Sequence, residues 1–315
     1  MNREITTQEK LDARMAAALR IARIIRRVSI AASVLGALIV FALIQPGTVR
    51  AAWAKIASIM RIESEVPPVA LNDLPAGFVE QIDALPPQQQ AEVLMQRSID
   101  HSPAAALLVP RYSKAWLGKV SLSPELTGVL GTALNEDDLR VRAAAIEVYL
   151  AANKVPKTPR GATQLSHVID TNPAGRPWAL WMLGALGNRG IEPDKAFAKL
   201  VNYLHDSDEQ TRYWTVEGLA QLGTDGTVDP LLDAFRNDSS AEVRQRAASS
   251  LARTGMLSGR QRLNAVPSLI EMAEDPALDP SAKIWVFQAL ADITGERLGH
   301  DPTEWRDWWF THRQR

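Results

Sequence analysis

Hydrophobic and polar positions recur in a fixed order along the second half of the chain. In each unit a basic residue is followed three positions later by a small or β-branched residue, and four positions further by an aliphatic or aromatic one. The basic residues are Arg142, Arg176, Arg212, Arg244 and Lys283, which are 34, 36, 32 and 39 residues apart. A period in the thirties with two helical patterns per unit predicts an all-α fold, an α-solenoid of stacked helix pairs.

The same pattern places the helices and their ends. First helices are expected within residues 123–135, 162–170, 194–206, 227–238 and 263–275, and second helices are expected to end near Asn153, Gly187, Gly223, Gly255 and Gly295. Carboxylates in the turns are suited to cap the second helices, because the free amides and the dipole of a helix N-terminus favour anions. These carboxylates are Asp138, Asp206, Asp208, Asp238, Asp275 and Asp279.

An uncharged apolar run lies far upstream of the repeats, at residues 28–44. As a helix it reaches roughly 25 Å, close to the thickness of the apolar core of a bilayer. Residues 1–27 carry seven Lys and Arg, whereas the first stretch after the run offers three, Arg50, Lys55 and Arg61. By the positive-inside rule the N-terminus is cytoplasmic. We therefore expect a single transmembrane helix in a bacterial inner membrane, with the repeats in the periplasm.

Two points about this N-terminal region have alternatives. Ala52-Trp53-Ala54 loosely resembles a signal-peptidase site, so a cleaved signal peptide is the rival of a retained anchor. Residues 1–27 have the spacing of a basic amphipathic helix, which either lies on the anionic inner leaflet or extends the spanning helix.

Composition limits the chemistry. The 315 residues contain no cysteine, which excludes disulfides, thiolate metal sites and cysteine nucleophiles. Residues 45–315 carry 28 Lys and Arg against 33 Asp and Glu, so a basic face for nucleic acid is not expected. No GxSxG, Walker or Rossmann glycine pattern is present, and the histidines lack zinc-type spacing. We expect no catalytic residues, no metal and no cofactor.

The repeat sequences resemble HEAT-repeat proteins, particularly the bacterial HEAT-like class first described in phycobilin lyases. The resemblance covers about residues 121–295 and is carried by Asp206-Ser-Asp208 with Thr211-Arg212, and by Asn237-Asp238 with Val243-Arg244 and Ala247 to Leu251. It implies the fold, whereas relatives include scaffolds, chromophore lyases, iron hydroxylases and nucleic-acid enzymes. The hydroxylase branch needs His-Glu pairs, and none of the five histidines is followed by Glu.

With this resemblance the chain divides into six segments. We expect a cytoplasmic segment at 1–27, the transmembrane helix at 28–44, a stalk at 45–71, a helical N-terminal cap or degenerate repeats at 72–120, five HEAT-like repeats at 121–295 and a capping helix at 296–315. In the capping helix, Trp305 and Trp308 fall on one face and Trp309 follows; sealing of the last repeat is favoured over partner binding.

Tryptophan marks one position of the second helices. The residue just before the small position is Ala144, Trp178, Trp214, Arg246 or Trp285, and Trp181 lies on the next turn after Trp178. Because second helices line the concave side of HEAT arrays, these side chains could grip a peptide or helix. The alternative is that each ring only fills the gap between repeats.

These observations predict a membrane-anchored, non-catalytic scaffold or adaptor that binds a protein partner through the concave face. The candidate partner-binding residues are Trp178, Trp181, Trp214, Arg246 and Trp285. An accessory or lyase-like enzyme acting on a bound cofactor or chromophore is the alternative. A sensor is a third possibility, although residues 1–27 are too short to hold a signalling domain.

Overall fold

The computed structural model describes residues 74–100 and 102–312. The interpretations of residues 1–71, including the predicted span at 28–44 and the stalk, lie outside the described residues. None of the helices in the described part has the length and apolar character needed to cross a bilayer. The described residues belong to one compact unit.

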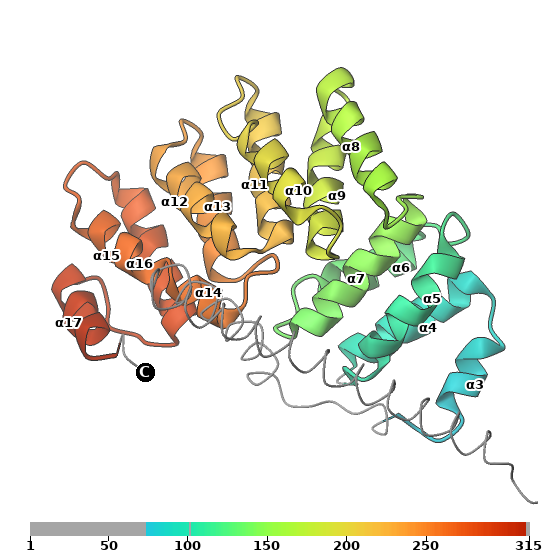
Figure 1. The fold of residues 1–315 in the computed structure, drawn as a ribbon. Coiled ribbons are helices and arrows are strands. Elements are labelled where there is room, and N and C mark those ends of the chain that lie inside the picture. Colours follow the sequence, from blue (N-terminus) through green and yellow to red (C-terminus); the bar gives the residue numbers. More distant parts are fainter. Residues whose placement is uncertain (1–73, 101, 313–315) are drawn as a thin grey trace, which may run out of the picture. The chain divides into compact units, whose positions relative to one another are not determined.

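The described residues fold only into helices and turns, which confirms the all-α prediction for this part (Figure 1). The N-terminal block consists of α3 (Phe78–Asp83), α4 (Pro87–Ile99), the 3₁₀ helix η2 (Ala105–Leu108) and α5 (Val109–Trp116). Five helix pairs follow: α6 (Pro124–Ala133) with α7 (Leu139–Ala152), α8 (Pro159–Thr171) with α9 (Arg176–Asn188), α10 (Pro193–Val201) with α11 (Glu209–Leu222), α12 (Val228–Asn237) with α13 (Ala241–Ala252), and α15 (Val266–Glu274) with α16 (Pro280–Thr294). The short helices η3 (Asp225–Thr227) and α14 (Gly259–Leu263) lie in connections, and α17 (Pro302–His312) closes the described chain.

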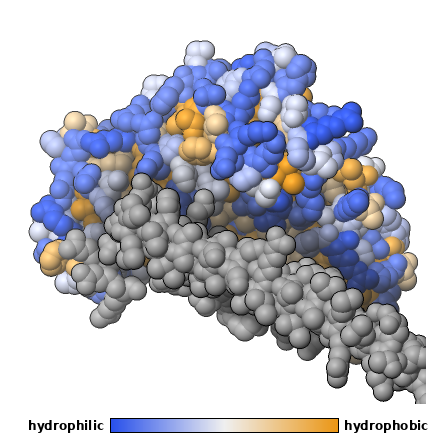
Figure 2. Space-filling model, in the orientation of Figure 1, coloured by the Kyte–Doolittle hydropathy of each residue, from blue (hydrophilic) through white to orange (hydrophobic). Residues whose placement is uncertain are grey.

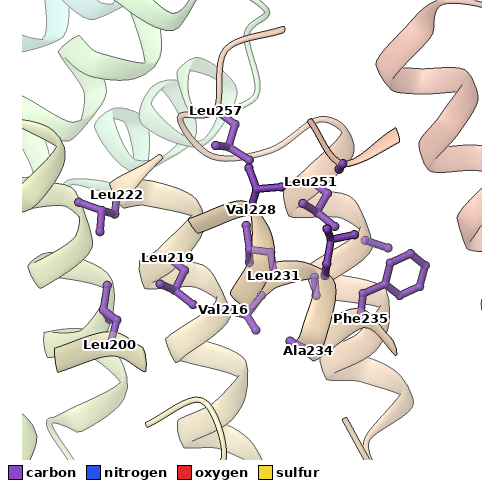
Figure 3. Close-up of a cluster of buried hydrophobic side chains, with 14 of the residues drawn as sticks. Leu200, Val216, Leu219, Leu222, Val228, Leu231, Ala234, Phe235, Leu251 and Leu257 are labelled. Atoms are coloured by element: carbon purple, nitrogen blue, oxygen red, sulfur yellow. The ribbon is translucent and has the colours of Figure 1, made fainter. Parts of the chain in front are cut away.

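This succession of stacked pairs is consistent with an α-solenoid. Buried side chains of neighbouring pairs meet in one continuous core that runs from α7 to α17. Figure 3 shows part of it, where Val216 and Leu219 of α11 lie close to Val228 and Leu231 of α12. A second core joins α3–α7, and α7 contributes to both, with Val148 in the N-terminal core and Ile146 in the other.

Three of the six turn carboxylates cap second helices as predicted. Asp138, Asp208 and Asp279 accept hydrogen bonds from the backbone amides of Arg140, Thr211 and Ala282, at 2.8–2.9 Å. The prediction is wrong for the other three, Asp206, Asp238 and Asp275, which lie two or more residues too early to reach the first helical amides. Ser240 caps α13 instead.

The basic column has a structural role that the repeat pattern did not reveal. Arg212 donates backwards to the carbonyl of Asp206 at 3.0 Å and forwards to the Asp238 carboxylate of the next turn at 2.8 Å. Arg244 repeats this arrangement one unit later, with the carbonyl of Asp238 and the carboxylate of Asp279. Each guanidinium group therefore donates to a carbonyl of its own turn and links this turn to the following one.

Arg142 keeps the backward bond, from Nε to the carbonyl of Glu136, but its forward contact differs. Its Nη1 donates to the carbonyls of Arg253 and Gly255, at 2.8 and 2.6 Å, more than a hundred residues along the chain. Buried Arg262 donates to four carbonyls of the same region, those of Ser250, Leu251, Thr254 and Leu257. Two guanidinium groups thus satisfy the carbonyl end of α13, which would otherwise be buried without donors.

The second helices α9 and α11 touch backbone to backbone. A Cβ placed on Gly184 would lie 1.9 Å from the carbonyl oxygen of Gly218, and one on Gly218 would lie 2.6 Å from that of Leu180. Real carbon atoms do not approach so closely, so only glycine permits this helix spacing.

We expect Gly184→Ala to lower the free energy of unfolding by about 1–3 kcal/mol, because the added methyl group forces α9 and α11 apart. Thermal or urea unfolding of the purified protein measures this. The matched control is Gly128→Ala on the exposed face of α6, where nothing lies within 4 Å of the new methyl group. The control should be neutral or slightly stabilising, and equal effects of both variants would contradict the close helix contact.

Candidate partner-binding surface

Four second helices lie side by side in the order α9, α11, α13, α16 (Figure 1). Their equivalent positions therefore form a continuous row across the array. We call it the indole row; its members are Trp178, Trp214, Arg246 and Trp285. The corresponding residue of α7, Ala144, is 2% exposed and does not extend the row.

Every member of the indole row reaches solvent. Trp178 is 38% exposed, and the other three are half-buried. Trp214 and Trp285 also pack one side against the main core. The rings therefore lie at the border between core and surface, so each is partly packed and partly available for contact.

At the α7 end of the row, two tryptophans are held by the preceding pair. Trp178 donates from Nε1 to Oδ1 of Asn153 at 3.2 Å, just beyond the end of α7. Trp181 packs edge to face against Tyr149 of α7, with ring centroids 5.3 Å apart. Trp181 therefore fills the gap between repeats, as the packing alternative requires, whereas the ring of Trp178 remains the most exposed indole of the row.

Arg246 is not a free cation. It forms an ion pair with Glu217 of α11, one turn beyond Trp214 on that helix. Glu217 is 7% exposed, and its burial raises the pKa of the carboxyl group while Arg246 opposes the rise. Arg246 thereby links α11 to α13 and neutralises a buried carboxylate, a partner that the sequence pattern did not indicate.

The C-terminal tryptophans form a separate group. Trp305 is fully buried and donates from Nε1 to the carbonyl of Gly299 at 3.0 Å. Trp308 and Trp309 are half-buried, and α17 packs against α15. The sealing role of this helix stays a prediction, because it rests on the resemblance to other arrays.

The hollow found in the described residues lies outside the indole row. A hollow of about 610 Å³ lies between α3, α4 and α6, lined by both apolar and charged side chains such as Phe78, Val93 and Arg97. It includes no residue of the row. Among residues 74–100 and 102–312, no group of three or more His, Asp or Glu side chains is arranged to hold a metal ion.

Comparison with known families decides the nature of the central repeats. Residues 161–252, which span α8–α13, match the family model of HEAT repeats. This part of the chain consists of HEAT repeats. Among curated proteins, none matches the sequence. The HEAT match confirms the resemblance seen in the turn and arginine motifs, and it covers three of the five helix pairs.

We expect Arg246→Met to destabilise the fold by up to about 3–5 kcal/mol at pH 7, because the buried carboxyl group of Glu217 would lose the positive charge that compensates it. A carboxyl group with a raised folded-state pKa favours the folded state below its unfolded-state pKa, and this contribution is lost as the pH rises through the folded-state pKa. The deficit of the variant should therefore shrink towards pH 4 and grow towards pH 8. Unfolding curves measured across this range test it.

The matched control is Arg253→Met, which breaks a more exposed pair with Asp292 on the neighbouring helices. Its effect should be small and should not depend on pH in this way. A deficit of Arg246→Met that is the same at every pH would exclude the burial of a charged Glu217 as its cause.

Proposed function

We propose that the protein is a non-catalytic scaffold or adaptor, anchored in a bacterial inner membrane by residues 28–44, that binds a protein partner through the face of its second helices. The indole row supports this proposal: aromatic side chains that are partly exposed recur at one position on α9, α11 and α16, with Arg246 between them on α13. Tryptophan and arginine are the residues most enriched where binding energy concentrates.

The dimensions of the row fit a polypeptide. Packed helices lie 8–10 Å apart, so four neighbouring helices place the ends of the row roughly 24–30 Å from each other. An extended segment of about eight residues spans this distance at about 3.3 Å per residue. A small molecule would contact one or two of the rings and leave the others unused.

The family match agrees with this function. HEAT repeats are generally scaffolds for protein interactions, and a stacked array offers an extended surface because every unit contributes one equivalent strip. The proposed location places this surface in the periplasm, and the proposed partner is a protein or a segment of one.

We expect the double variant Trp214→Ala/Trp285→Ala to lose capture of the partner by at least about tenfold, because two contact rings are removed from the centre and end of the row. A photo-crosslinking residue placed at exposed Gln245 of α13, in the full chain within native membranes, would report the partner as a crosslinked species of defined mass. Quantifying that species in both proteins gives the loss.

The matched control is Trp309→Ala, because Trp309 is half-buried against the same core but lies on α17 and is not a member of the row. It should retain the crosslinked species. Unchanged crosslinking in the double variant would contradict the proposal. Loss of helical circular dichroism in the double variant, with Trp309→Ala still folded, would assign the rings to packing.

A further inference from the structure

Two segments of the described chain carry basic residues and no acidic ones. The sequence has 36 Asp and Glu in total, yet none falls between residues 102 and 124 or between residues 148 and 169. The first segment contains Arg111, Lys114 and Lys119, and the second contains Lys154, Lys157 and Arg160.

The fold brings these two segments together. The amide of Gly118, in the loop between α5 and α6, donates to the carbonyl of Ala151 at the end of α7 at 3.0 Å. Lys157 Nζ lies 3.3 Å from the hydroxyl of Ser113. A Cβ on Gly118 would lie 3.5 Å from Cγ of Lys154, so the stem of this lysine rests on the loop.

Most of the charges in this region are not neutralised. Lys114, Lys119, Lys154 and Arg160 are exposed, and none of them forms an ion pair within the described part of the chain. Lys157 pairs with the buried carboxylate of Glu147 at 2.5 Å. Elsewhere on the described surface, arginines such as Arg212, Arg244 and Arg306 pair with carboxylates.

Exposed apolar side chains lie among these cations. Leu117 and Leu122, on either side of Lys119 in the loop, are 39% and 40% exposed. Trp178 contacts Asn153, the neighbour of Lys154, and is 38% exposed. These three are among the most exposed large hydrophobic side chains of the described residues, so one region combines apolar side chains with unpaired positive charge.

The backbone of Lys154 adopts a conformation that is unusual for lysine. Its φ is +60°, a left-handed conformation that glycine or asparagine adopts more readily than lysine. The chain therefore carries a long cationic side chain at a position where local conformation favours another residue. This side chain lies against Gly118, the neighbour of exposed Leu117.

We propose that this basic–apolar patch, formed by Lys114, Leu117, Lys119, Leu122, Lys154 and Arg160, docks on the anionic headgroups of a lipid bilayer. Lysines next to exposed leucines suit a surface whose charge is diffuse and whose interior is apolar. An acidic peptide would favour arginines with fixed bidentate geometry, and three of the four unpaired cations are lysines. Because residues 45–315 carry 33 acidic against 28 basic side chains, an anionic membrane repels the body as a whole, and the patch would orient it.

The presence of a nearby membrane rests on the anchoring proposed above, whereas the lipid affinity of the patch is a separate property. The two can be tested separately because the chain contains no cysteine. A single Leu122→Cys substitution therefore allows one polarity-sensitive fluorophore to be attached to the patch of the full chain. An Ala277→Cys substitution in the exposed α15–α16 turn provides the matched label away from it.

The labelled proteins are mixed or reconstituted with vesicles of phosphatidylcholine, with and without phosphatidylglycerol. We expect the label at position 122 to report an apolar environment only on vesicles containing phosphatidylglycerol, and this response to disappear at high salt. Replacing Lys114, Lys119, Lys154 and Arg160 together by glutamine should abolish this response, because the loss of each charge lowers the affinity for the vesicles by about fivefold. Substituting Arg97, Lys195, Arg236 and Arg297 in the same way should leave it unchanged.

Three outcomes would overturn the proposal: no response at position 122, an equal response on neutral vesicles, or an equal response at position 277. A response to polyglutamate in the absence of lipid would identify an acidic polypeptide as the ligand instead. Removal of the protein from neutral vesicles by a salt wash would refute the membrane anchor alone, because the response of the patch on anionic vesicles is read independently of it.

Circular dichroism of the glutamine variant separates lost charge from lost folding. Lys154→Asn, in which asparagine suits the left-handed conformation, gives a second variant that removes a charge.

Discussion

The array depends on finding donors for the carbonyl groups in its turns. A helix leaves its last four carbonyls without intrahelical partners, and stacking places many of these ends and turns against neighbouring units. Arg212 and Arg244 of the second helices supply such donors. Each guanidinium group donates to a carbonyl of its own turn and to a carboxylate of the next turn. The same side chain therefore satisfies the backbone and sets the spacing of adjacent units.

Where this arrangement changes, the architecture changes with it. Arg142 occupies the same column in the sequence, yet it reaches the end of α13 and not the following turn. Arg262 lies nearby, and burial together with the charge of Arg142 lowers its pKa to about 10, so it remains charged at neutral pH. The helix α7 contributes to both cores and thereby joins the N-terminal block to the repeats.

The two proposed surfaces differ in their physical character. The indole row spans four helices, and its side chains are partly packed against the array. Their conformational freedom is therefore restricted before a partner binds, which lowers the entropic cost of binding. The basic–apolar patch lies on the last turn of α5, the first turn of α8 and the loops that follow α5 and α7, and its exposed charges are in contact with water. Hydrophilic residues dominate the visible face in Figure 2, where only small apolar groups interrupt them.

The sequence by itself determined the helical repeat, its period and the second-helix position of the tryptophans, because these depend on spacing within a few turns of one helix. It also indicated the caps at Asp138, Asp208 and Asp279, which are local. Only the tertiary structure decided that Asp238 serves Arg212, that Arg246 pairs with Glu217 and that Arg142 reaches α13, because these partners are 26, 29 and more than a hundred residues apart. The meeting of two acid-free segments beside Lys154 likewise required the fold, since no local rule relates a loop after α5 to the turn after α7.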